Sequence, residues 1–451
     1  MTEKAKSTPT AKLSLGTLIA MCTGQAIGAG VITVTGLAVG VTGRSTWLAY
    51  VAAVLVGFIL ILPIILYSSV VRYRGGQYTL VTSLLGERWG GVYALGVLPM
   101  FVAGGTAGLA IGTYINSIFP SVSAVAAGLA VMTFLYLLNM MGINIMAKVQ
   151  SAMTVFLIIC LVTFCLLGLG NLQPGTFQIN SEGYFMGGSA GFFSAVAMLM
   201  YGTTGQSFAA AFSINAKNAK RDIPIMMMVV TGVILVLFST IGLVAGNVLP
   251  VEVVAGKPLT LVARELFPGP LFYVFVIGGP VMALVTTLNA SYPTLCAPIA
   301  GATANGWLPK QLAKRNRFGV PFILYTAMYV ISILPLLLNF SLSFLTNNTV
   351  LISGVVAIVA KVAIFFMPKK FGEHWKSSKL YMKNFIFYPL MTVSLALQLV
   401  IIYLNGKALT GTVLLVNIAV FVALVSYALY RHKTGKAHAG ADYSFDEDLE
   451  D

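Results

Sequence analysis

The chain has 451 residues, of which 58% are hydrophobic and only 9% are charged, and its mean hydropathy is +0.90. Soluble domains carry about 25% charged residues, so this composition excludes an ordinary soluble domain and predicts an integral membrane protein. The net charge of +14 does not indicate a nucleic-acid partner, because the basic residues are scattered between apolar runs. They are expected to set the orientation in the lipid bilayer instead.

The first and sixth apolar runs are both interrupted by glycine. Residues 1–13 form a polar N-terminal segment, and the run that follows is broken at 24–30, Gly-Gln-Ala-Ile-Gly-Ala-Gly. The sixth run is broken at 201–205, Tyr-Gly-Thr-Thr-Gly. Unsatisfied amides in hydrocarbon cost several kcal/mol each, so a membrane helix rarely gives up its hydrogen bonds. Interruptions at corresponding positions of two halves indicate the binding site of a transporter.

Runs of about 18 or more apolar residues predict transmembrane helices, and the fold class is therefore all-α. Twelve runs follow one another: 14–40, 46–71, 89–116, 121–142, 145–170, 187–214, 223–248, 269–301, 320–339, 343–367, 384–404 and 410–430. Residues 76–85 are predicted to form a short helix between spans 2 and 3.

Lysine and arginine accumulate on the cytoplasmic side of membrane proteins. With the N-terminus inside, most of the basic residues lie in predicted cytoplasmic loops, and the opposite side holds Arg44, Lys257, Arg264 and Lys407. Both termini are therefore predicted to be cytoplasmic, with the protein in the plasma membrane. Lys361 lies within span 10, near its cytoplasmic end, and is expected to snorkel to the surface.

Five spans per repeat is an odd number, so two such repeats must be inverted relative to each other. The first repeat is predicted at 14–170 (spans 1–5) and the second at 187–367 (spans 6–10), so that each begins with an interrupted helix. Residues 384–430 carry spans 11 and 12. Residues 431–451 form a cytoplasmic tail, and its acidic part, 442–451, is predicted to be disordered.

Aspartate, glutamate and histidine are missing from the predicted spans. This disfavours a cationic substrate, a carboxylate proton relay and a membrane enzyme, and no cofactor or metal cluster is predicted. The backbone is then the remaining source of binding groups within the spans. Free amides on one side of a break and free carbonyls on the other complement a zwitterion, so a neutral α-amino acid is the predicted substrate.

Each of these signals also has a simpler interpretation. Gly24 and Gly28 form a small-xxx-small pair, which is typical of close helix packing. Gly104, Gly105 and Gly108 in span 3 are interpreted as packing residues that could also make room for a substrate. The hydroxyls of Thr286 and Thr287 commonly bond back to the preceding helical turn.

Four short motifs, in order and at the expected spans, resemble those of the amino acid–polyamine–organocation family of permeases, which has the leucine-transporter fold. They are Ile-Gly-Ala-Gly-Val-Ile at 27–32, Gly-Gly-Gln-Tyr at 75–78, Lys-Asn-Ala-Lys-Arg-Asp-Ile-Pro at 217–224 and Asn-Gly-Trp-Leu-Pro at 305–309. The resemblance covers most of the chain through span 9.

The resemblance implies a substrate site built around the two breaks. The amides of Gly28, Ala29 and Gly30 would hold the carboxylate, and the carbonyls of Ala26, Met198 and Tyr201 the amino group. Met198, Thr204 and span-3 residues near Met100, Phe101 and Gly104 would line the side-chain pocket. Ile27, Gly202 and Thr203 complete the predicted set.

The resemblance also bears on the coupling ion. Many sodium-independent relatives have a lysine in the middle of span 5, and here that position is Leu157. Sodium-coupled proteins of this fold hold the ion with span-1 carbonyls and span-8 hydroxyls. The corresponding groups are the carbonyls of Gly24, Ile27 and Ala283 and the hydroxyls of Thr286 and Thr287. A sodium-coupled symporter is predicted, with a sodium-independent exchanger, a proton symporter or a non-transporting receptor as alternatives.

Overall fold

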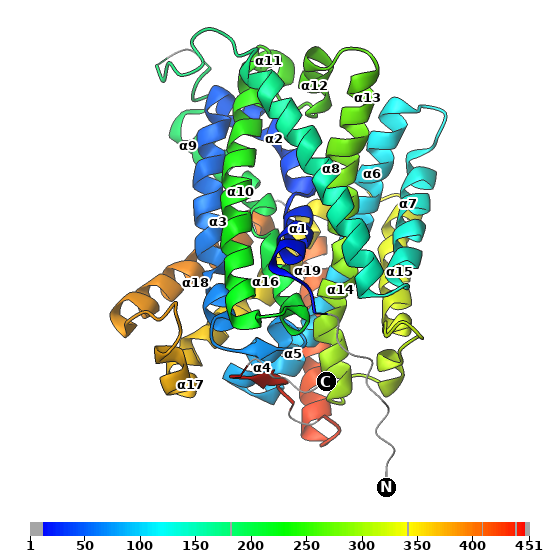
Figure 1. The fold of residues 1–451 in the computed structure, drawn as a ribbon, viewed down its shortest axis with the longest axis vertical. Helices are drawn as coiled ribbons and strands as arrows, with labels where there is room; N and C mark the ends of the chain where they lie inside the picture. Colours follow the sequence, from blue (N-terminus) through cyan, green and yellow to red (C-terminus); the bar gives the residue numbers. More distant parts are fainter. Residues whose placement is uncertain (1–11, 181–182, 341, 408, 438–439, 447–451) are drawn as a thin grey trace.

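A computed structural model describes residues 12–180, 183–340, 342–407, 409–437 and 440–446 as a bundle of helices (Figure 1). Eight helical stretches of this described part are long and apolar enough to cross a membrane. Helices occupy each of the twelve predicted runs, although several are shorter or interrupted. The structure is thus that of an all-α membrane protein, and the number of spans and the inverted repeat stay predictions.

The helices at the predicted runs have the following bounds. They are α1 (Leu15–Ala26) and α2 (Ala29–Thr42); α3 (Thr46–Ser68); α5 (Glu87–Val97), η2 (Leu98–Val102) and α6 (Ala103–Ile118); α7 (Ala124–Asn139); α8 (Ile143–Leu169); α9 (Gly188–Leu199), η3 (Met200–Gly202) and η4 (Gly205–Asn215); α10 (Ala219–Asn247); α13 (Pro270–Val276), η5 (Ile277–Val281) and α14 (Met282–Ala304); α15 (Phe322–Leu337); α16 (Leu342–Ala363) and η7 (Ile364–Phe366); α18 (Asn384–Lys407); and α19 (Gly411–Lys433).

Shorter elements cap the two ends of the bundle (Figure 1). They are η1 (Gly43–Ser45), α4 (Gln77–Leu85), α11 (Val251–Val254), α12 (Thr260–Leu266), η6 (Lys310–Ala313), α17 (Met367–Lys376), β1 (Arg72–Tyr73) and β2 (Tyr443–Ser444). The short helix expected at 76–85 is confirmed as α4. Both ends of the described chain lie toward the end of the bundle that carries α4 and α17, which is the predicted cytoplasmic end.

The described part of the acidic tail, residues 442–446, is ordered where disorder was expected. Tyr443 and Ser444 pair antiparallel with Tyr73 and Arg72, and the carboxylate of Asp442 lies 3.3 Å from the Arg74 guanidinium. The ring of Phe445 stacks on His374, with centroids 3.8 Å apart. The prediction failed for 442–446 because a two-residue strand pairing leaves no periodic signal in the sequence. Residues 447–451 lie outside the described part, as do residues 1–11.

Glycines let the helices approach backbone to backbone. A Cβ atom on Gly112 of α6 would overlap the carbonyl oxygen of Ala124 in α7, and one on Gly128 of α7 would overlap the carbonyl of Gly108. In lipid there is little hydrophobic drive between helices, so such contacts hold them together by close van der Waals packing. The packing interpretation of Gly108 is confirmed, since its missing Cβ leaves room for Met132.

We expect Gly112→Val to destabilise the bundle, because the new methyl groups must push α7 off the α6 backbone. Overpacking of this kind costs about 1–3 kcal/mol. The purified variant should lose its monodisperse elution profile at a lower temperature than the wild type. Gly406→Val is the matched control, since no atom lies within 4 Å of that position. Equal melting temperatures for the two variants would contradict the close contact.

Candidate functional site

The break in the first span is short and lies between two well-formed helices. α1 ends at Ala26, Ile27 leaves the helix with φ −82° and ψ 86°, and Gly28 is extended with φ −124° and ψ −153°. Residues 24–26 were expected in the break but are still helical. Gly28 caps α2 without a side-chain hydrogen bond. The first amides of a helix lack intrahelical acceptors, and the start of a helix is therefore a place where an anion can bind.

The sixth span is interrupted at Thr203 and Thr204. These two residues separate η3 from η4, and the chain then continues as a 3₁₀-helix from Gly205 to Asn215. The two breaks meet in space, because a Cβ atom on Gly205 would lie 3.0 Å from the Cα of Ala26. Only glycine allows the sixth span to touch the first at this point.

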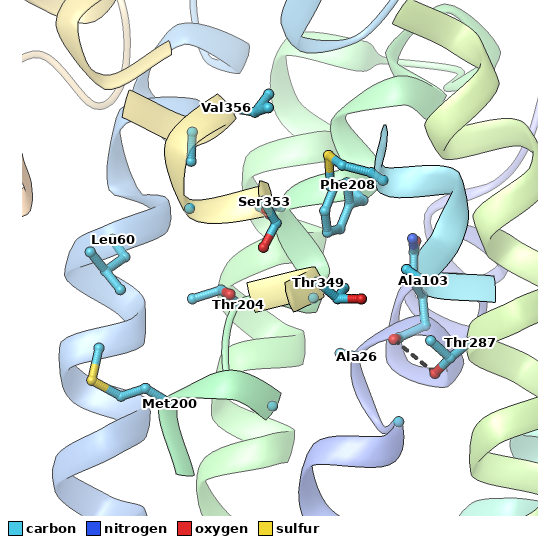
Figure 2. Close-up of a pocket in the computed structure, with 18 of the residues that line it drawn as sticks. Ala26, Leu60, Ala103, Met200, Thr204, Phe208, Thr287, Thr349, Ser353 and Val356 are labelled. Carbon is cyan, nitrogen blue, oxygen red and sulfur yellow. Dashed lines mark hydrogen bonds between the residues drawn. The ribbon is translucent and has the colours of Figure 1, made fainter. Parts of the chain in front are cut away.

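A cavity of about 550 Å³ lies at the two breaks, a size typical of small-molecule sites. Figure 2 shows Leu60, Met200 and Thr204 on one side of it, and Ala26, Ala103 and Thr287 on the other. Of the predicted substrate residues, those that line it are Ala26, Gly28, Met100, Gly104, Met198, Gly202 and Thr204. Ile27, Phe101 and Thr203 are fully buried outside the lining, and the side chains of Ala29, Gly30 and Tyr201 lie outside the described set.

Span 8 closes the C-terminal end of α1 with its two hydroxyls. The Oγ1 atom of Thr286 lies 2.8 Å from the carbonyl oxygen of Gly24 and 3.0 Å from that of Ala283. The Oγ1 atom of Thr287 lies 3.2 Å from the carbonyl of Gln25 and 3.0 Å from that of Ala283. Four of the five groups predicted for sodium therefore converge. Ile27, the fifth, takes no part in the hydrogen bonds described for this group.

A buried network of side-chain amides adjoins Thr286. The Gln150 side chain donates to the Thr286 carbonyl at 3.0 Å and accepts from Asn289 at 2.7 Å. Asn139 donates to Asn289 at 2.7 Å. The network joins α7, α8 and α14 and holds span 8 beside Gly24. Sequence reasoning based on charged residues missed it, although neutral amides within apolar spans are themselves a signal of interhelical hydrogen bonding.

The α8 residues that face Gly24 are Gln150 and Thr154. A Cβ atom on Gly24 would overlap the Thr154 hydroxyl and lie 2.8 Å from the amide nitrogen of Gln150. Leu157, predicted to stand where relatives have a lysine, is fully buried. The small-xxx-small interpretation of Gly24 and Gly28 is thus also supported, because both approach neighbouring side chains closely. A Cβ atom on Gly28 would lie 2.6 Å from the Thr287 hydroxyl.

The expectation that Lys361 snorkels to the surface is wrong. Its side chain is 5% exposed, and its Nζ donates to the carbonyl of Leu60 in α3 and to the hydroxyl of Ser394 in α18. It lines the same cavity as Gly28. Proximity to the predicted helix end suggested an exit to the surface, whereas α3 and α18 cover the helix face that carries Lys361.

The comparisons with known proteins agree with this architecture. A family model described as "Amino acid permease" matches residues 13–427. The uncharacterized transporter Rv1979c of Mycobacterium tuberculosis (strain ATCC 25618 / H37Rv) is 24% identical over 395 residues, covering 79% of this chain and 80% of its own length. The uncharacterized transporter Mb2001c of Mycobacterium bovis matches with the same identity and coverage. Together with the interrupted spans, these matches point to a transporter rather than an enzyme, and the chain belongs to the amino acid permease family.

Proposed function

We propose that this permease is a secondary active transporter of neutral amino acids that works by alternating access, with sodium as the coupling ion. The breaks of spans 1 and 6 carry the substrate part of the proposal. They bring the free amides of α2 and the 3₁₀ turn before Thr203 to one cavity, where an α-carboxylate and an α-ammonium group can be bound together.

The cavity wall favours substrates without a positive side chain. Aspartate and glutamate are absent from the described residues that line it, so a cationic side chain would find no counter-charge. The apolar residues Met100, Met198 and Leu288 and the small residue Gly104 lie in the wall, where they can accommodate the body of an amino acid side chain.

The oxygen atoms around Gly24 support sodium coupling. Two carbonyls and two hydroxyls, from Gly24, Ala283, Thr286 and Thr287, are all neutral oxygen ligands of the kind that holds sodium at unwound membrane helices. Each hydroxyl keeps lone pairs for a cation once its O–H bond turns away from the carbonyl. These residues would hold the ion, whose charge would offset that of the substrate carboxylate beyond Gly28.

One observation favours the alternative function, that of a sodium-independent exchanger or proton symporter. The hydroxyls of Thr286 and Thr287 already donate to carbonyls, and a Thr286 that only caps the end of α1 needs no ion.

The direct test is uptake of labelled neutral amino acids into proteoliposomes under an inward sodium gradient, compared with choline at equal osmolarity. We expect accumulation only with sodium. Sodium-independent uptake that requires preloaded amino acid would establish the exchanger instead. Binding without uptake in either condition would indicate a receptor.

Gly28→Leu is expected to reduce uptake to background while the protein remains folded in the membrane. Its side chain would collide with Thr287 and fill the space in front of the α2 amides. Gly232→Leu is the matched control, because this mid-helix glycine of α10 has no atom within 4 Å. Normal uptake by the Gly28 variant, measured at equal amounts of folded protein, would remove the break from the substrate site.

Thr287→Ala is expected to raise the sodium concentration for half-maximal uptake by about tenfold, which corresponds to about 1.4 kcal/mol of lost ion binding. Thr240→Ala serves as the control, since the described hydrogen bond of its hydroxyl lies within α10, to the carbonyl of Val236. If both variants keep the sodium dependence of the wild type, Thr287 is not an ion ligand.

A further inference from the structure

Lys361 is the single charged side chain among the described residues that line the cavity. It is almost fully buried, and its described hydrogen-bond partners are a backbone carbonyl and a hydroxyl, at Leu60 and Ser394, which are both uncharged. A charged group inside a membrane protein is costly and indicates a functional role by default. Packing alone does not require a lysine here, since an apolar side chain of the same length would fill the space without this cost.

The lysine lies close to the break in span 6. On α3, Gly57 packs directly against Thr203. A Cβ atom on Gly57 would overlap the Thr203 hydroxyl. Leu60, whose carbonyl binds Lys361, is three residues further along α3, a rise of about 4.5 Å. Figure 2 shows Leu60 on the same side of the cavity as Thr204 and Met200. The ammonium group is therefore bound about one helical turn beyond the break.

Two adjoining faces of α16 line the cavity, and the second of them carries Lys361. Thr349, Ser353, Val356 and Ala360 line the cavity from one face of α16, and Lys361 follows Gly354 and Ala357 on the adjoining face, which also lines it. On α18, Gln398 also lines the cavity, one turn from the Ser394 hydroxyl that accepts from the lysine. Thr349, Ser353 and Gln398 thus give the cavity wall formed by α16 and α18 polar groups besides the ammonium group.

We propose that Lys361 binds the terminal oxygen of the substrate side chain, and that the permease prefers amino acids whose side chains end in a carboxamide or a carboxylate. This inference rests on the proposed amino acid transport, and it adds acidic side chains to the neutral substrate class proposed above. An ammonium group has three N–H donors, and Leu60 and Ser394 accept two of them, which leaves one for a ligand. A substrate anchored by its α-carboxylate at the α2 amides would direct its side chain toward span 6 and this donor.

The chemistry of the ammonium group explains how Lys361 would discriminate between substrate side chains. A hydrogen bond from a charged donor is stronger than a neutral one, and a substrate that ends in a methyl group leaves that donor without an acceptor. Glutamine, glutamate and methionine have side chains of similar length, so they differ mainly at the group that would meet Lys361. They are therefore the probes of choice.

The experiment measures uptake of labelled glutamine, glutamate and methionine by the full-length protein in proteoliposomes, for the wild type, Lys361→Met and Lys361→Arg. We expect a lower KM for glutamine or glutamate than for methionine in the wild type. Lys361→Met should raise the KM of the preferred oxygen-bearing substrate by about tenfold and leave that of methionine unchanged. Lys361→Arg, which keeps the charged donor, should retain much of the preference for the oxygen-bearing substrate over methionine. Which of glutamine and glutamate is preferred distinguishes the carboxamide from the carboxylate.

Lys370→Met is the matched control, because this lysine also donates to a backbone carbonyl, that of Ser83, but lies outside the cavity lining. Equal KM changes for all three substrates in Lys361→Met, or no change, would overturn the proposal and leave a structural lysine. If the wild type takes up methionine but neither of the others, the subsite is wrong and the transport function stands. If it takes up no amino acid, the proposed function fails and this assignment fails with it.

Discussion

The need to satisfy backbone hydrogen bonds away from water governs the whole structure. Every described span that keeps its helix meets this need internally, and spans 1 and 6 do not. At the end of α1, the hydroxyls of Thr286 and Thr287 bind the carbonyls that the helix leaves open. At the start of α2 no side chain caps the helix. At the first break, the carbonyls thus have side-chain partners and the start of α2 has no side-chain cap, which suits an anionic end of a ligand.

The breaks can exist only because their surroundings are rigid. Glycine removes the side chain where the segments lie closest, as at Gly205 against the α1 backbone and Gly57 against the Thr203 side chain. The amide chain from Asn139 through Asn289 to Gln150 then fixes span 8 behind Gly24. A half-satisfied polar network would be costly in this environment, and this one connects three helices in sequence. The cavity is thus framed by groups whose positions depend on one another.

Much of this could be predicted from the sequence. Length and apolarity locate helices at each predicted run, and the glycines of 24–30 and 201–205 locate both breaks to within a few residues. Other features depend on which helix faces meet, which periodicity does not reveal. Lys361 was misplaced because its distance from a helix end says nothing of α3 and α18 beside it. Gln150 and Asn289 were overlooked because each is informative only when paired with the other.

The pairing of β1 with β2 has a consequence for how the protein is made. Arg72 and Tyr73 emerge from the ribosome early, whereas their partners Ser444 and Tyr443 are synthesised only after all the membrane helices. Proteins generally assemble from the N-terminus as the chain grows. The loop between α3 and α4 must therefore wait for its strand partner until the tail has been synthesised. Closure of this surface by the tail is then a late step of biogenesis, which marks a chain whose helices up to α19 have been synthesised.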